Sequence, residues 1–412
     1  SATASTMLWG KKKAVREVFT FEDLTRFPMV FYKTIGEDLY SERDKNLLRR
    51  YLLRCYLVLG FLNFNAYVVG EIAYFIVHIT STTTLLEATA VAPCIGFSFM
   101  ADFKQFGLTV NRRTLVKLLD DLKAIFPMSK QQQQAYHVAY YNKHMNRVMW
   151  LFTILCMTYT SSFSFYPAIK STIKYYFMGS EIFERNYGFH IYFPYDAETD
   201  ITVYWFSYWG LAHCAYVAGV SYVCVDLLLI TTITQLTMHF NYMADTLEAY
   251  DGDAHTEAEN VKWAQNLVVY HARALDLSEE VNNIFSFTIL WNFIAASLVI
   301  CFAGFQITAS NVEDIVLYFI FFSASLVQVF VVCYYGDEMI SSSSRIGHSA
   351  FNHNWLPCSS QYKQIMRYII MRSQKPASIR PPTFPPISFN TFMKVISMSY
   401  QFFALLRTTY YG

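Results

Sequence analysis

The sequence predicts an all-α integral membrane protein with seven transmembrane helices. Its composition, its apolar stretches and the placement of its basic residues all point to this fold class. The 412 residues are 54% hydrophobic and 18% aromatic, and only 15% are charged, whereas soluble proteins carry about 25% charged residues. A chain this poor in charge is typical of a polytopic membrane protein.

Seven apolar stretches are long enough to cross a hydrocarbon core of about 30 Å as helices that rise about 1.5 Å per residue. They cover residues 51–79, 85–108, 148–169, 203–233, 284–307, 312–335 and 388–411. Pro167 is expected to end the third stretch, because proline disrupts a helix interior. The seventh stretch is the least hydrophobic, as expected of a helix that faces water.

The basic residues between these stretches predict how the chain lies in the membrane, since Lys and Arg accumulate on the cytoplasmic side. The segments before the first stretch and after every second one carry 25 Lys and Arg residues, whereas the other side carries only Lys170, Lys174 and Arg185. The N-terminus is therefore expected in the cytoplasm and the C-terminus outside. This orientation is opposite to that of G-protein-coupled receptors, whose sequence motifs are also absent.

These boundaries divide the chain into four parts. Residues 1–50 form a cytoplasmic N-terminal segment, in which residues 1–6 look like an expression remnant ahead of Met7. Residues 51–335 hold spans one to six with cytoplasmic helical extensions. Residues 336–387 hold cytoplasmic anchor helices and a linker, and residues 388–412 form the seventh span.

Two amphipathic stripes lie in the cytoplasmic extensions. One, at helical and heptad-like spacing, comprises Val261, Ala264, Leu267, Val268, His271, Ala274, Leu275 and Ser278. The other comprises Trp355, Tyr362, Ile365, Met366 and Ile369. Each stripe either packs within one chain or joins subunits below the membrane.

The seventh span carries one polar face, which predicts a pore lining with a gate. Residues spaced by three or four share one side of a helix, and that side here consists of Lys394, Ser397, Gln401, Leu405 and Thr408. A polar seam packed against neighbouring helices is the alternative.

Aromatic and hydroxyl side chains gather at the outer ends of spans two, three, four and six. They predict a cavity for a small, mostly apolar ligand, although aromatic belts at membrane interfaces account for part of this pattern. The candidate ligand-binding residues are Leu86, Ala90, Tyr159, Ser162, Phe163, Tyr166, Tyr204, Tyr208, Ala212, Tyr318 and Phe322.

The sequence contains no pattern of catalytic residues, so we expect neither an enzyme nor a cofactor, and no nucleic-acid partner. Six or seven of the eight cysteines lie within apolar runs, and none has metal-ligand spacing. They are expected to be small buried side chains that form neither a disulfide framework nor a metal site. Three ionisable residues fall within spans, Glu71, Asp226 and Lys394. They are expected to face protein or water, and a structural partner is the hypothesis for Asp226. Lys394 either lines an ion path or extends its side chain to the cytoplasmic interface.

The C-terminal third resembles the insect odorant receptor family over about 80 residues. The resemblance begins with Cys333-Tyr334-Tyr335-Gly336-Asp337-Glu338, Ser341-Ser342, Ala350-Phe351 and Trp355. It continues with Arg372-Ser373-Gln374-Lys375-Pro376 and Ser388-Phe389, and ends with Phe392, Lys394, Ser399-Tyr400, Phe403 and Leu405-Leu406-Arg407.

The resemblance implies a tetrameric odorant-gated cation channel in the plasma membrane of sensory neurons. In this family span seven lines the pore, a cytoplasmic helical anchor domain holds the subunits together, and a small volatile odorant binds among spans two to six. The gate position falls on Leu405, with Thr408 one turn further out. The short loop between spans four and five and the Leu405-Leu406-Arg407 ending imply a ligand-specific tuning subunit that pairs with the shared co-receptor.

Three alternatives remain open at this point. A gustatory-type homomeric channel shares the topology, and a non-channel inverted seven-helix receptor would signal through guanine nucleotides. A transporter would move substrate without a channel-sized current, although no paired broken helices of the kind found in transporters are seen.

Overall fold

The computed structural model describes residues 18–43, 45–79, 85–179, 183–197, 200–309 and 312–411, and their regular structure is helical. The helices are α1 (Phe21–Lys33), η1 (Ser41–Arg43), α2 (Leu47–Ile79), α3 (Leu85–Ile125), α4 (Lys130–Ala135), α5 (Val138–Phe177), α6 (Ile201–Ala249), η3 (Gly252–Ala254), α7 (Glu257–Ala309), α8 (Val312–Asn352), α9 (Ser360–Ser373) and α10 (Phe389–Tyr411). All seven predicted spans are therefore helices.

Six of these helices, α2, α3, α5, α6, α7 and α8, are long and apolar enough to cross a membrane. The seventh predicted span is the 23-residue helix α10, which does not reach the same apolarity over the described residues. The crossing of α10 therefore stays a prediction. The expectation that Pro167 ends the third span was wrong, because α5 continues through this residue to Phe177.

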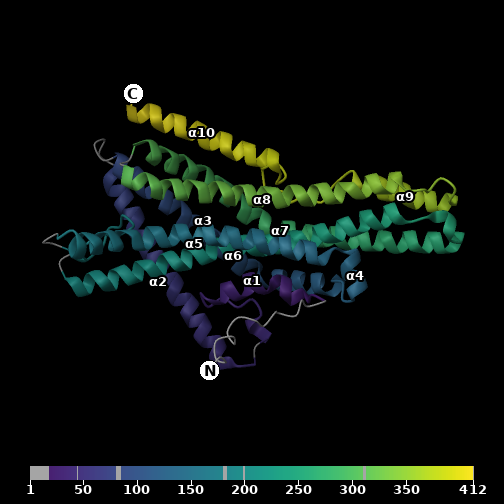
Figure 1. The fold of residues 1–412 in the computed structure, drawn as a ribbon, viewed down its shortest axis with the longest axis horizontal. Helices are drawn as coiled ribbons and strands as arrows, with labels where there is room; N and C mark the ends of the chain where they lie inside the picture. Colours follow the sequence, from purple (N-terminus) through teal and green to yellow (C-terminus); the bar gives the residue numbers. More distant parts are fainter. Residues whose placement is uncertain are drawn as a thin grey trace, which may run out of the picture.

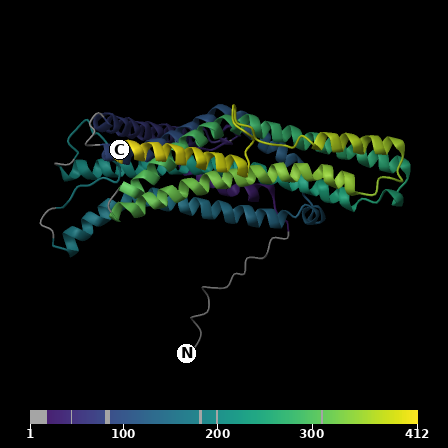
Figure 2. The same ribbon diagram turned by 90° about the horizontal axis from the view of Figure 1, so that it is seen from above.

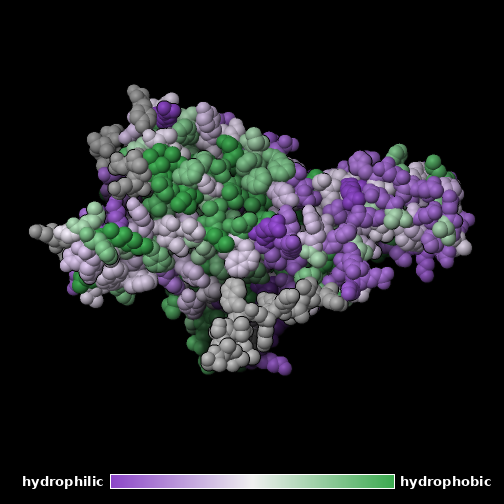
Figure 3. Space-filling view, in the orientation of Figure 1, coloured by the Kyte–Doolittle hydropathy of each residue, from purple (hydrophilic) through white to green (hydrophobic). Residues whose placement is uncertain are grey.

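The molecule has an apolar half and a polar lobe, which share three continuous helices (Figure 1). The polar lobe consists of α9 with residues 234–249 of α6, 257–283 of α7 and 336–352 of α8. Hydrophobic side chains dominate the surface of the half that holds α2 and α10, and hydrophilic ones dominate the polar lobe (Figure 3). The 49 residues of α6 extend over about 73 Å, which connects both parts.

The helix α6 forms the centre of the bundle. Its residues are buried without interruption from Val217 to Phe240, so this stretch shows no amphipathic period. The amphipathic stripe of α7 packs inward, with Ala264, His271 and Ala274 buried, whereas Val268 is 38% exposed. In α9, Tyr362, Met366 and Ile369 are buried too. The two amphipathic stripes thus pack largely within one chain.

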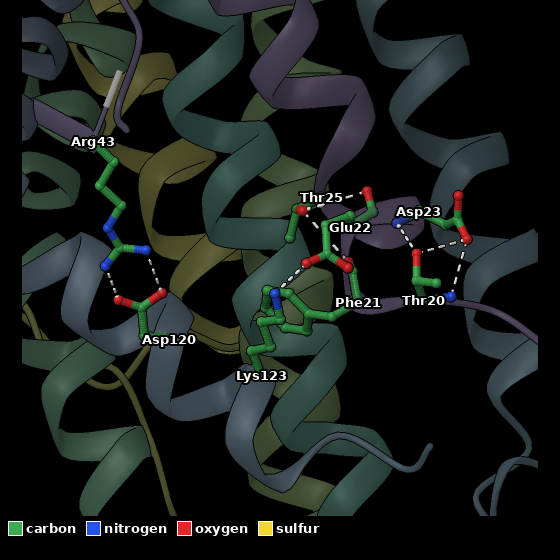
Figure 4. A network of polar contacts seen from close by, with 8 residues as sticks. All are labelled: Thr20, Phe21, Glu22, Asp23, Thr25, Arg43, Asp120 and Lys123. Carbon is green, nitrogen blue, oxygen red and sulfur yellow. Dashed lines mark hydrogen bonds and ion pairs between the residues drawn. The ribbon is translucent and has the colours of Figure 1, made fainter. Parts of the chain in front are cut away.

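The N-terminal segment is fastened to α3 by ion pairs (Figure 4). Thr20 and Asp23 form a capping box that starts α1. Lys123 at the end of α3 pairs with Glu22, and Arg43 pairs with Asp120. These contacts hold α1 and η1 beside the bundle.

The helix α10 begins where its lead-in segment crosses α8. Gly336 leaves no room for a side chain there, since a Cβ atom would lie 2.7 Å from both the carbonyl oxygen and the Cγ2 atom of Ile387. The backbone N–H of Phe389 donates to Asp337 over 3.4 Å. From this junction α10 runs beside α8 along the apolar half to the C-terminus (Figures 1 and 2).

Candidate ligand-binding and pore sites

A cavity of about 380 Å³, here called the main cavity, lies among α3, α5, α7, α8 and the loop between α5 and α6. Its size suits a small molecule. Its walls are largely apolar and aromatic, with a few polar groups. The lining residues are Leu86, Glu87, Ala90, Val91, Cys94, Phe163, Tyr166, Pro167, Lys170, Asn186, Tyr187, Gly188, Phe189, His190, Gln306, Ala309, Leu317 and Tyr318.

Polar contacts hold the first turns of α3 against α7 and α8 beside the main cavity. The Gln306 amide on α7 donates to the Leu86 carbonyl and to the Thr89 hydroxyl, each over 3.0 Å. The Tyr318 hydroxyl on α8 lies 3.5 Å from the Ala90 carbonyl, which is at the limit of a hydrogen bond. The Tyr318 ring packs edge-on against Phe163 of α5, with centroids 6.2 Å apart. A movement of α7 or α8 would therefore alter the cavity wall.

Residues 183–197, here called the roof loop, cover one side of the main cavity. Gly188 approaches α5 so closely that a Cβ atom would lie 1.8 Å from the Phe163 carbonyl oxygen. On the other side, the Tyr192 N–H donates to the Gly70 carbonyl of α2 over 3.1 Å. A Cβ atom on Gly70 would meet the Ile191 side chain at 2.6 Å. The two glycines allow the roof loop to press onto both helices.

The structure brings five of the predicted ligand-binding residues together on the main cavity. These five are Leu86, Ala90, Phe163, Tyr166 and Tyr318. Two others line neighbouring spaces. Tyr159 borders a small chamber that adjoins the main cavity, and Ser162 faces an open groove between α5 and α8, to which Tyr166 also belongs.

The other four predicted residues lie off the main cavity. Tyr204 donates to the Asn186 carbonyl over 3.2 Å, and Tyr208 donates to the Ser164 carbonyl, so both hold the roof loop and α5 from behind. Ala212 is half-buried on α6, which does not contribute to the cavity lining. Phe322 lies against Gly304 of α7, on the side where Phe403 of α10 packs.

Sequence reasoning missed the roof loop and two polar cavity residues, Gln306 and Lys170. The sequence of the loop has no periodicity that would predict its position. The structure shows that Asn186 to His190 line the cavity, because Gly188 allows the loop to pack tightly on α5. Gln306 was detectable as a polar residue within the fifth apolar stretch, where an amide needs a partner.

A buried ion pair crosses the bundle near its centre. Lys104 of α3 lies 2.7 Å from Asp226 of α6, and the two side chains are 2% and 5% exposed. Gln328 of α8 donates to the same Asp226 oxygen over 2.9 Å and accepts from Asn292 of α7 over 3.2 Å. The network joins four helices and supplies the partner expected for Asp226. Lys104 was missed, although it is a basic residue inside the second apolar stretch.

The predicted pore residues all lie on the exposed side of α10. Lys394, Gln401 and Thr408 are exposed, and Leu405 is 66% exposed. The opposite side of α10, with Thr391, Val395 and Ser399, is buried against the bundle. Hence the polar face points away from the chain's own helices, and it is not a seam within this chain.

The comparisons with known proteins agree with this architecture. A protein-family model described as 7tm Odorant receptor matches residues 84–400. The Drosophila melanogaster protein named odorant receptor 92a is 86% identical over 402 residues, which cover 98% of each chain. Odorant receptor 67c of the same species is 51% identical over 95% of this chain and 97% of its own.

Solved structures show the same fold. The olfactory receptor OR5 of Machilis hrabei superposes with a TM-score of 0.74 at 12% identity, covering 94% of this chain and 98% of its own. The structure of that receptor in complex with eugenol superposes with a TM-score of 0.72 and covers 94% of this chain and 97% of its own. From the family match and the two relatives, we conclude that this multi-pass membrane protein belongs to the 7tm odorant receptor family.

Proposed function

We propose that this chain is an odorant-gated, non-selective cation-channel subunit that pairs with a shared co-receptor in a heterotetramer. A small volatile odorant, apolar or aromatic in character, fills the main cavity, and α10 lines the pore with its C-terminus outside the cell. The site of action is the plasma membrane of sensory neurons.

One observation carries the proposal. The face of α10 with Lys394, Gln401, Leu405 and Thr408 is turned away from the chain's own bundle and is open to partner subunits or water. Its other face packs on α7 and α8, the helices that also wall the main cavity. One pair of helices thus contacts both the proposed ligand and the proposed pore lining.

The contacts between these helices suggest how binding opens the pore. Phe305 of α7, next to the cavity residue Gln306, packs on Tyr410 of α10 with ring centroids 5.3 Å apart. A ligand opens a channel only if it binds the open arrangement better than the closed one. An odorant that shifts α7 or α8 would tilt α10 and move Leu405 off the pore axis. A wider ring of leucines admits water and then cations.

The decisive experiment records whole-cell current from cells that express this chain with and without an odorant co-receptor. The expected result is a fast, non-selective cation current, evoked by small volatiles only in the paired cells. Current from the chain alone would instead support a homomeric channel. Silence in both, with protein present at the surface, would refute the channel function.

A further inference from the structure

A second, smaller space adjoins the main cavity and is here called the side chamber. Its volume is about 20 Å³, enough for one or two atoms of a ligand or for one water molecule. It shares Cys94 and Phe189 with the lining of the main cavity. The other lining residues are Phe64, Glu71, Phe97, Ser98, Tyr159, Thr160, Leu211, Cys214, Ala215 and Ala218. The two spaces thus border the same two side chains.

The side chamber contains a carboxyl group whose hydrogen bonding is incomplete. Glu71 of α2 is 5% exposed, and its Oε2 atom is buried without a hydrogen-bond partner among the described residues. The Ser98 side chain lies close to this carboxyl in the lining of the chamber. The hydroxyl of Thr160 is already engaged, because it donates to the Cys156 carbonyl over 3.0 Å. A buried polar atom without a partner is costly, so Oε2 is a site for an added group.

The surroundings select the kind of group that fits. The residues that line the side chamber include no Lys, Arg or His. A lone carboxylate is very unfavourable in such an apolar site, whereas the neutral acid is tolerated if its O–H is bonded. A neutral carboxylic acid offers one O–H donor in addition to its acceptor oxygens. The matching partner is therefore an oxygen that accepts a hydrogen bond.

We propose that Glu71 donates a hydrogen bond to an acceptor oxygen of the odorant, whose polar end enters the side chamber while its apolar body fills the main cavity. This inference rests on the proposed odorant-gated function. It assigns the ligand class, small aldehydes, ketones and esters, and it makes Glu71 a specificity-determining residue on a helix that does not line the main cavity.

The test compares pairs of volatiles that differ only in a carbonyl oxygen and a methylene group, such as benzaldehyde with styrene and cyclohexanone with methylenecyclohexane. Cells that express the wild-type chain with the co-receptor should respond to the carbonyl member at lower concentration. Glu71→Leu should raise the half-maximal concentration for the carbonyl compounds about tenfold, the effect of one lost hydrogen bond. It should leave the methylene compounds unchanged, and Glu71→Gln should preserve part of the preference, since its amide also donates.

The control Thr231→Val removes another buried hydroxyl, one that donates to the Leu227 carbonyl on α6. It should leave the preference intact. Equal shifts for both members of a pair in Glu71→Leu, or no shift, would mean that only a structural water occupies the chamber and would overturn the inference. A wild-type receptor that responds to methylene compounds alone would also overturn it. No current to any volatile would instead count against the proposed function.

Infrared difference spectroscopy on the purified complex gives a readout independent of current. Adding the carbonyl odorant should shift the C=O stretch of a protonated carboxylic acid, and this band should be missing in Glu71→Gln. A carboxylate band at Glu71, or an acid band that ignores the odorant, would overturn the inference.

Discussion

The stability of the bundle core is expected to depend on both partners of the buried ion pair between Lys104 and Asp226. Lys104 and Asp226 neutralise each other where water is excluded, and removing one partner leaves the other charge uncompensated. We expect Lys104→Met to destabilise the fold by about 3–5 kcal/mol, the usual cost of breaking a buried pair. Thermal unfolding of the detergent-solubilised protein, with the amount of surface protein, measures this loss.

The double variant Lys104→Met with Asp226→Leu tests the cause, because it removes both charges together. Its stability should recover most of the loss, since apolar side chains can replace a buried ion pair at little cost. A double variant as unstable as the single one would mean that the pair is not the source of the effect.

Among the predicted ligand-binding residues, Tyr318 lies on the cavity wall and contacts both Ala90 of α3 and Phe163 of α5. We expect Tyr318→Ala to raise the half-maximal odorant concentration about tenfold or more, because it removes an aromatic wall. Tyr318→Phe keeps the ring and should change the response far less. The matched control is Tyr368→Ala, an exposed tyrosine of α9; equal odorant sensitivity in all three variants would remove Tyr318 from the site.

We expect His353 to make the stability of the fold depend on pH. Its Nδ1 donates to the Ala350 carbonyl over 2.9 Å, so the neutral ring accepts from the Tyr362 hydroxyl at Nε2, also over 2.9 Å. Burial lowers the pKa of His353 below its usual value of about 6.5. Below that pH the unfolded chain binds a proton that the folded chain does not, so the free energy of unfolding falls as the pH drops from 7 to 5.

The measurement is the thermal unfolding temperature of the wild type and of His353→Gln, at neutral and at acidic pH. The wild type should lose more stability on acidification, because glutamine does not titrate. The same loss in both proteins would assign the pH dependence to other groups.

At the junction of α8 and α10, Gly336 leaves no room for a side chain. We expect Gly336→Ala to displace the α10 lead-in, because its Cβ would collide with the backbone of Ile387. The odorant-evoked current should be lost or strongly reduced while the rest of the bundle still folds. Gly304→Ala is the matched control on α7, since its Cβ would stand 3.7 Å from the nearest atom, Cε2 of Phe322. Equal currents from both variants would refute the role of the junction.

Helix positions could be read from the sequence more reliably than the contacts between helices. Apolar length alone located seven helices, six of which are long and apolar enough to cross a membrane, because a membrane helix needs a minimum number of apolar residues. The continuation of α5 past Pro167 could not be read in the same way, since the missing N–H of proline is tolerated when neighbouring helices pack around it. The roof loop was missed because its position depends on Gly188 and Gly70, which are far apart in the sequence.

The candidate site was also predicted only in part, because it depends on how the helices pack against one another. Tyr204 and Tyr208 belong to an aromatic cluster at the start of α6, as their sequence pattern indicates. Which side of a helix faces a cavity, however, depends on its rotation within the bundle. That rotation placed these two tyrosines behind the roof loop instead of inside the main cavity.

At the scale of the whole molecule, the proposed pore exists only when several subunits bring their α10 helices together. We expect Leu405→Ala to increase the current without odorant, because a ring of smaller side chains no longer excludes water. The holding current of paired cells measures this effect. Met393→Ala, 63% exposed on α10 but off the predicted stripe, serves as control. An unchanged resting and evoked current in Leu405→Ala would place the gate elsewhere.

The unbroken burial of α6 also limits how receptors of this shape can diverge. One residue inserted between Val217 and Phe240 would rotate everything beyond it by about 100°, which would carry Asp226 away from Lys104 or shift the lobe against the bundle. Insertions and deletions should therefore collect at residues 250–256, where α6 has ended and α7 has not begun. The length of α6 is therefore constrained, and differences in ligand preference between receptors of this fold are expected to arise in the elements around it.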